Sequence, residues 1–373
     1  MLKSAFFSII YWDPNPTLFT LPYINHPLRW YGLLFMGGIA AGFLILLPLL
    51  RQKLLKGHSL RERDISNWLA LQKSVYQSIE DPANPLHSIA STLDKKTCHL
   101  LQQNKELPDA NKAVLLGALS SLDRKQLEKL LPKTIIPLNK LTFKYVDDLM
   151  WWIVIGTVVG ARLGHVFFYD WTRFQRNLVD IFKVWEGGLA SHGGTIGVVL
   201  AIYLYSRRNR EKFPELSFLA LSDLLSIPVA FAVIFIRLGN FVNQEILGTP
   251  SFVPWAVVFG HPADGTVPIP RHPVQLYEAI AYFLTFLLLT TLWKFKKGIS
   301  TEGLYTGIFF VCVFGSRFFL EFFKATQSSQ LFDGGFLQAG QILSLPFVAF
   351  GVLLTYWSQR GIYDIADKQP QNE

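Results

Sequence analysis

One histidine lies among glycines inside an apolar stretch of the chain. The segment from Trp185 to Gly197 reads WEGGLASHGGTIG, with His192 at its centre. A histidine near the end of a membrane span can accept a proton, and neighbouring glycines let another molecule approach the backbone closely. The same glycines would equally allow two helices to pack tightly, with the imidazole hydrogen-bonded and inert. This segment alone does not decide between the two interpretations.

Three further polar clusters each contain an arginine. They are Arg237-Leu-Gly-Asn240 followed by Asn243, Glu245 and Gly248, then Arg271 with Glu278, and Arg317 with Glu321. Arginine offers planar, bidentate donors to a phosphate and stays charged even when desolvated. Taken singly, each residue also has a structural explanation. Glu321, for example, follows Arg317 by one helical turn and could simply pair with it.

The composition is typical of an integral membrane protein. The 373 residues are 50% hydrophobic and only 17% charged, whereas a soluble globular protein carries about 25% charged residues. The net charge of +8 does not indicate a nucleic-acid partner, because the basic residues gather beside apolar stretches, where membrane topology requires them. We therefore expect an all-α polytopic membrane protein.

About seven stretches are long and apolar enough to cross a bilayer, which takes roughly 20 residues per helix. Basic residues crowd one set of connections, as in Arg207–Lys212, and the positive-inside rule assigns that set to the cytoplasm. The N-terminus is then outside and the C-terminus inside. The expected spans are Leu28–Leu50, Leu149–Tyr169, Gly188–Tyr205, Phe218–Ile236, Pro273–Trp293, Gly303–Phe323 and Gln338–Trp357.

This topology divides the chain into four parts. Residues 1–51 form a periplasmic segment and the first span, 52–144 a polar cytoplasmic insertion, 145–358 the remaining spans, and 359–373 a cytoplasmic tail. In the insertion, the leucine spacing within Leu119–Leu131 predicts an amphipathic helical patch. We interpret the insertion as a helical module that binds a partner and carries no chemistry of its own.

The same topology places the polar clusters at one depth. Tyr31, His192, Arg237, Arg271 and Arg317 all fall in the outer parts of spans or beside them. Jointly, the clusters predict a cavity with arginines, amide and carboxylate groups and one imidazole. Such a cavity suits an anionic phospholipid headgroup.

The second span carries Arg162 among glycines at positions 156, 160 and 164. Small residues at a spacing of four favour close packing between helices, and we assign these glycines to packing. A charge within the hydrocarbon region is costly unless it finds a partner. Arg162 must therefore face protein or a polar cavity.

Six motifs in order resemble those of bacterial prolipoprotein diacylglyceryl transferases. The resemblance extends from about Arg29 to Pro346, and the motifs are Trp30–Gly32, Ala161–Gly164, Ser191–Gly197, Arg237–Gly248, Arg271–Glu278 and Arg317–Glu321. It implies seven spans in the bacterial inner membrane, with the active site toward the periplasm. It also implies transfer of diacylglycerol from phosphatidylglycerol to the lipobox cysteine of a prolipoprotein, forming a thioether and releasing glycerol phosphate.

The chain departs from the family pattern at several points. The 52–144 insertion is far longer than the loop usual in the family. Val313 stands where many members have tyrosine, and Lys324 ends a stretch that elsewhere ends in arginine. Ser191 replaces a common aromatic residue, and Thr249 a frequent arginine. These departures concern details of headgroup contact.

Under this resemblance we assign roles to individual residues. His192 would accept the thiol proton, since a cysteine of pKa about 8.5 is deprotonated at modest cost. Arg237 and Arg317 would hold the phosphate and stabilise its growing charge. Glu245 and Glu321 would orient arginines. The expected substrate-binding residues are Tyr31, Arg162, Gly193, Gly194, Asn240, Asn243, Glu245, Gly248, Arg271, Glu278 and Glu321.

Two alternatives from other functional classes stay open at this point. A secondary transporter would tend to show internal repeats and broken spans, and we find neither. A non-catalytic protein that binds anionic phospholipid would need many of the same residues. We expect no metal and no other cofactor. The expected contacts are phosphatidylglycerol, prolipoprotein lipobox peptides and membrane lipid, with no nucleic acid, and we expect a monomer.

Overall fold

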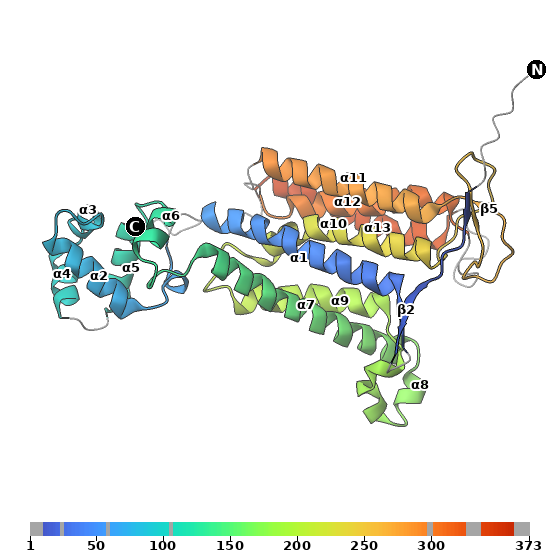
Figure 1. The fold of residues 1–373 in the computed structure, drawn as a ribbon, viewed down its shortest axis with the longest axis horizontal. Coiled ribbons are helices and arrows are strands. Elements are labelled where there is room, and N and C mark those ends of the chain that lie inside the picture. The colour runs from blue at the N-terminus through green and yellow to red at the C-terminus, as the bar shows by residue number, and fades with distance from the viewer. Residues whose placement is uncertain are drawn as a thin grey trace, which may run out of the picture. The chain divides into compact units, whose positions relative to one another are not determined.

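The computed structural model describes residues 10–22, 26–56, 60–103, 107–296, 301–325 and 337–361 (Figure 1). The expected tail lies outside the described residues from 362 onward, as do residues 1–9 of the N-terminal segment. The described chain is mostly helical, as predicted. It divides into two compact units, Met1–Leu46 with Leu219–Glu373 (unit 1) and Leu47–Phe218 (unit 2).

Six helices among the described residues are long and apolar enough to cross a membrane, and each overlaps a predicted span. The expected third span corresponds to α9 (Ser191–Arg208), an 18-residue helix that ends in two arginines and falls short of that standard. The count of seven spans and their orientation therefore stay predictions. The six helices are α1 (Trp30–Lys56), α7 (Leu138–Phe168), α10 (Phe218–Val242), α11 (Val274–Phe295), α12 (Leu304–Leu320) and α13 (Ala339–Gln359).

Helix α7 begins well before the expected span, inside the segment 52–144 predicted to be the insertion. Its first turns bury Leu138, Leu141 and Tyr145 on one face and expose Asn139, Lys140 and Lys144. This amphipathic spacing continues the helix beyond the apolar stretch. The Tyr145 ring packs edge-on against Tyr205 of α9, with ring centroids 5.1 Å apart.

Helices α7 and α9 run side by side in unit 2 (Figure 1). Glycines lie at their contact. A Cβ on Gly160 would lie 2.4 Å from the carbonyl oxygen of Gly193, and one on Gly197 would lie 2.0 Å from that of Gly156. No side chain fits between backbones this close. The packing role predicted for the α7 glycines is confirmed. Gly193 of α9 packs against the same glycines.

The insertion folds as a small helical module within unit 2. A core of buried leucines and isoleucines holds it together, with Leu71, Leu115 and Leu119 fully buried. The amphipathic patch predicted for Leu119–Leu131 is not one helix, because the chain turns after Leu119. Leu130 is exposed and does not share the buried face. The module comprises η1 (Glu62–Asp64), α2 (Trp68–Glu80), α3 (His87–Ala90), α4 (Lys95–Gln102), α5 (Asp109–Leu119) and α6 (Arg124–Leu130).

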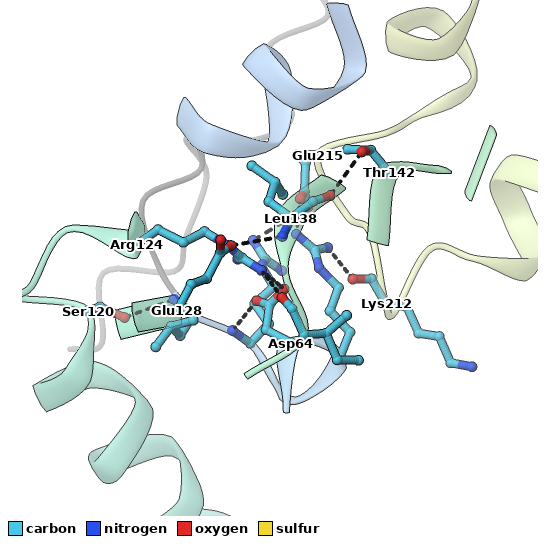
Figure 2. Close-up of polar contacts among 12 residues, drawn as sticks. Asp64, Ser120, Arg124, Glu128, Leu138, Thr142, Lys212 and Glu215 are labelled. Carbon is cyan, nitrogen blue, oxygen red and sulfur yellow. Dashed lines mark hydrogen bonds and ion pairs between the residues drawn. The ribbon is translucent and has the colours of Figure 1, made fainter. Parts of the chain in front are cut away.

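The two ends of the module meet at a neck. Ile65 and Ile135 form an antiparallel bridge, and the Ile136 amide donates to the Asp64 carbonyl at 2.8 Å. Figure 2 shows the polar contacts around this neck. The buried Asp64 carboxylate accepts from Arg124 at 3.0 Å, and Glu128 accepts from the Leu138 amide at 2.8 Å. These contacts fix the module to the start of α7.

The described part of unit 1 holds most of α1, then α10 to α13, and five short strands that the sequence analysis did not predict. Helices α11, α12 and α13 are consecutive neighbours. The buried Asp223 carboxylate of α10 accepts from the backbone amides of Gly303 and Thr306 at 2.7 and 2.8 Å, which satisfies the first turn of α12.

The strands of unit 1 form two small sheets. One has the order β1-β4-β5, with β1 (Ile10–Trp12) parallel to β4 (Val257–Phe259) and β4 antiparallel to β5 (Pro270–Arg271). The other pairs β2 (Thr17–Leu21) with β3 (His26–Arg29) in antiparallel register. The first sheet fixes the segment after α10 that carries part of the candidate site.

Candidate active site

Arg237 lies in the last turns of α10 and is held by two side chains. Its Nε is 2.9 Å from Glu278 Oε2, and its Nη1 donates to Asn240 Oδ1 at 3.2 Å. The guanidinium carbon also lies 5.9 Å from the centre of the Tyr282 ring. An arginine held at both Nε and Nη1 presents its charge in one orientation.

Glu278 joins two cations inside the protein. Its side chain is fully buried on α11, and Oε1 lies 2.8 Å from Lys324 Nζ. Lys324 is itself 5% exposed and pairs at 3.0 Å with Glu321 Oε2. The Glu321 carboxylate packs against Gly340, where a Cβ would lie 2.1 Å from Oε1. Four alternating charges thus run from Arg237 to Glu321.

Glu245 holds two amides instead of an arginine. Its carboxylate accepts from Asn240 Nδ2 at 3.0 Å and from Asn243 Nδ2 at 3.1 Å. The backbone turns sharply here, since Gln244 and Ile246 have positive φ angles of 53° and 55°. Non-glycine residues in this region are strained, and such strain persists only where the surroundings fix it.

Gln244 is fixed by a contact with the N-terminal segment. Its Nε2 donates to Asp13 Oδ1 at 3.0 Å, and its Oε1 accepts from the His261 amide at 2.7 Å. His261 Nδ1 lies 2.6 Å from the same Asp13 oxygen, and this hydrogen bond lowers the pKa of Asp13 below its ordinary value. The parallel pairing of β1 with β4 supports the contact.

The remaining unit 1 residues brace this region. Arg271 is buried and donates from Nη1 to the Gly248 carbonyl at 3.2 Å. Gly248 has no room for a side chain, because a Cβ would lie 2.2 Å from the His272 carbonyl oxygen. The Tyr31 ring packs on Gly239, where a Cβ would lie 2.7 Å from Cδ2. Arg271, expected as a substrate-binding residue, therefore holds the backbone at Gly248.

Arg237 and Arg317 line one cavity of about 230 Å³ within unit 1. The arginines supply its charge, and most of the other lining residues are apolar. These other lining residues are Val233, Ile236, Tyr282, Phe309, Val313 and Phe314. The cavity therefore combines a cationic group with an apolar wall, as a phospholipid combines a phosphate with hydrocarbon.

Four of the expected site residues lie in unit 2. His192 is exposed at the second position of α9, whereas Gly193 and Gly194 are buried against α7. The bare backbone predicted for substrate approach at Gly193 is thus occupied by a neighbouring helix. Arg162 is 4% exposed and donates to backbone carbonyls between Asp180 and Gly188.

The structure thus brings together most of the expected residues of unit 1 but pairs them differently. Glu278 orients Arg237, although the sequence assigned this task to Glu245 and Glu321. Lys324 joins the cluster and was missed as a site residue; its position three after Glu321 was the available signal. In the described part of the chain, no group of three or more His, Cys, Asp or Glu side chains could hold a metal ion.

Comparison with known proteins gives consistent matches. A family described as prolipoprotein diacylglyceryl transferase matches residues 115–357. The chain is 43% identical over 371 residues to the phosphatidylglycerol–prolipoprotein diacylglyceryl transferase of Protochlamydia amoebophila, covering 96% of this chain and 97% of that protein. It is also 46% identical over 215 residues to the protein of the same name from Tolumonas auensis, covering 58% and 80% of the two chains.

Proposed function

Because the chain belongs to the prolipoprotein diacylglyceryl transferase family, we propose which of its residues bind the donor lipid and which move the proton. The protein is a multi-pass membrane transferase that moves the diacylglyceryl group of phosphatidylglycerol to a prolipoprotein. The transporter and non-catalytic alternatives therefore fall away.

Arg237 and Arg317 bind the phosphate of the donor lipid. The observation that carries this proposal is the cavity that both arginines line, with apolar residues of α10 and α12 around them. The arginines match the phosphate, and the apolar residues match the adjoining hydrocarbon. Glu278 and Asn240 hold Arg237 before the lipid arrives, so little reorganisation is needed when charge develops.

The reaction that we propose is a displacement at the glycerol carbon. The sulfur of the lipobox cysteine forms a bond to this carbon, while the bond from the carbon to the phosphate oxygen breaks. The electron pair leaves with glycerol phosphate, and the arginines stabilise the growing negative charge. His192 accepts the proton of the thiol. Its exposed position at the start of α9 leaves the imidazole accessible.

The location that we propose is the bacterial inner membrane, with the catalytic residues toward the periplasm and the protein acting as a monomer. The distribution of basic residues supports this orientation.

Fusions to a reporter that is active only in the cytoplasm would test the orientation. A fusion after Trp357 should be active and a fusion at Pro262 inactive, and activity at Pro262 would reverse the orientation.

The reaction is tested by incubating the purified protein with phosphatidylglycerol and a synthetic lipobox peptide, and then weighing the peptide by mass spectrometry. The peptide should gain one diacylglyceryl group. Two controls should gain nothing: a peptide with serine in place of the cysteine, and a reaction without the anionic lipid. The full reaction run with Arg317→Met tests the phosphate site, because this variant keeps side-chain bulk but removes the charge.

A further inference from the structure

Arg162 has an unusual set of hydrogen-bond partners. Its guanidinium makes five hydrogen bonds, all of them to backbone carbonyl oxygens of one segment. Nη2 donates to Asp180 at 2.6 Å and to Lys183 at 3.0 Å, Nε donates to Ile181 at 2.8 Å, and Nη1 donates to Gly187 and, at 3.3 Å, to Gly188. We call these five carbonyls the carbonyl cage.

The cage uses the hydrogen-bonding capacity of Arg162 in full. A guanidinium has five N–H donors, and the cage provides five bonds. The side chain is 4% exposed, and the ring of the buried Phe174 lies 4.9 Å from the guanidinium carbon. A phosphate could reach Arg162 only by breaking the cage. The structure therefore favours a positioning role over the headgroup contact expected from the sequence.

Two glycines allow the segment to form the cage. Gly187 and Gly188 have φ angles of +87° and +71°, in the left-handed region that side chains disfavour. A Cβ on Gly188 would also lie 2.5 Å from Cδ2 of His165 and 3.1 Å from Nη1 of Arg162. Both glycines thus turn their carbonyls toward the arginine in a backbone conformation that side chains disfavour, and at Gly188 a side chain would also clash.

The same turn of α7 also holds the start of α9. The Ala190 amide donates to the Ala161 carbonyl at 2.9 Å, and the Gly194 amide then donates to the Ala190 carbonyl at 3.0 Å. His192 lies between these two anchored amides. Residues 161 and 162 therefore fix both the segment that leads into α9 and the residue immediately before that helix.

We propose that Arg162 is a positioning residue of the transfer reaction. Its guanidinium shapes residues 180–188, so that α9 begins at one place and His192 is held in one position. This proposal rests on the role proposed above for His192 as proton acceptor. Positioning of a catalytic group matters because small displacements reduce the rate strongly while leaving substrate binding largely unchanged.

The test compares Arg162→Lys with Gly188→Ala and with the matched control Arg173→Lys, whose arginine lies exposed on α8 (Trp171–Phe174). A lysine has three donors and cannot span five carbonyls, and alanine at 188 is strained and clashes with His165. Hydrogen–deuterium exchange should be faster by about tenfold or more in peptides covering 180–190 for the first two variants only.

Turnover should separate the two test variants from the control Arg173→Lys in the same way. For Arg162→Lys and Gly188→Ala, kcat should fall by about tenfold or more, and KM for phosphatidylglycerol should change by less than about threefold. Unchanged exchange together with a raised KM would assign Arg162 to the phosphate and overturn the proposal. Normal kcat in Gly188→Ala, despite faster exchange, would also overturn it.

A double variant separates this proposal from the role of His192. If Arg162 acts through His192, then Arg162→Lys should lower kcat much less in a His192→Gln background than in the wild type. The full loss in both backgrounds would overturn the proposal. Failure of the proton-acceptor role itself would appear separately, as a normal rate in the single variant His192→Gln.

Discussion

Replacing Glu278 with glutamine should cost both stability and turnover. The carboxylate is fully buried, 2.9 Å from Arg237 Nε and 2.8 Å from Lys324 Nζ. Glutamine keeps the shape but removes the negative charge between two cations. Breaking a buried ion pair by changing one partner costs about 3–5 kcal/mol. Each kcal/mol of lost stability lowers the melting temperature of a larger domain by about 2–4 °C. We therefore expect the melting temperature to fall by roughly 6–20 °C.

The activity of Glu278→Gln should fall further than its folded fraction, because Arg237 loses the contact that orients it. A loss of about 3 kcal/mol in transition-state stabilisation corresponds to roughly a hundredfold in rate. Melting can be followed by tryptophan fluorescence in detergent, and turnover by the mass gain of a lipobox peptide. Glu211→Gln, on an exposed connection, is the matched control and should change neither quantity.

A double variant tests the electrostatic explanation directly. Glu278→Gln combined with Lys324→Met removes the ammonium that would be left buried beside a neutral amide. Stability should recover in part, whereas activity should not, because Arg237 still lacks its carboxylate. A melting temperature for Glu278→Gln within 2 °C of wild type, with turnover within about twofold, would refute the reasoning.

Three further predictions follow from the same contacts. Arg237→Lys keeps the charge but loses the bidentate geometry, so kcat should fall sharply in correctly folded protein; near-normal turnover would reduce Arg237 to an anchor. His192→Gln should lower the rate by about a hundredfold and make the residual rate rise more steeply toward pH 9 than in wild type, whereas parallel pH–rate profiles would remove the base role. The folded protein holds the pKa of Asp13 below its ordinary value of 3.8. The stability that the Asp13 carboxylate contributes is therefore present above pH 3.8 and is lost as the pH falls through the folded pKa. The protection of the His261 amide against exchange, relative to its intrinsic rate at each pH, should therefore fall in acid, and Asp13→Asn should abolish that dependence; an identical acid response in the variant would contradict it.

The helices were predictable because their signals are local. The apolar stretches of α1, α10 and α11 are long enough to identify spans directly. The early start of α7 was missed because its first turns are amphipathic rather than apolar. The short strands were missed for another reason: Ile10 pairs with Val257, and no local pattern in a three-residue strand indicates so distant a partner.

The residue types of the site were predictable, but their pairing was not. Glu321 lies one helical turn after Arg317, and this spacing suggested an ion pair. The structure instead pairs Glu321 with Lys324, because the chain leaves α12 and enters η4 (Glu321–Phe323) at that point. Likewise, Arg162 was recognised as a buried charge in need of a partner. Backbone carbonyls carry no sequence signal, so its cage could not be foreseen.

Because its two ends meet at the neck, the module could be removed without moving the helices on either side of it. The chain enters at Ile65 and returns at Ile135 as its antiparallel neighbour, and paired residues of this kind have Cα atoms about 5 Å apart. A tight turn could therefore replace everything between them without changing the distance that the connection from α1 to α7 must cover. Chains with a short loop here and chains with a full module can then share one arrangement of helices, and the module can be gained, lost or exchanged as a single piece.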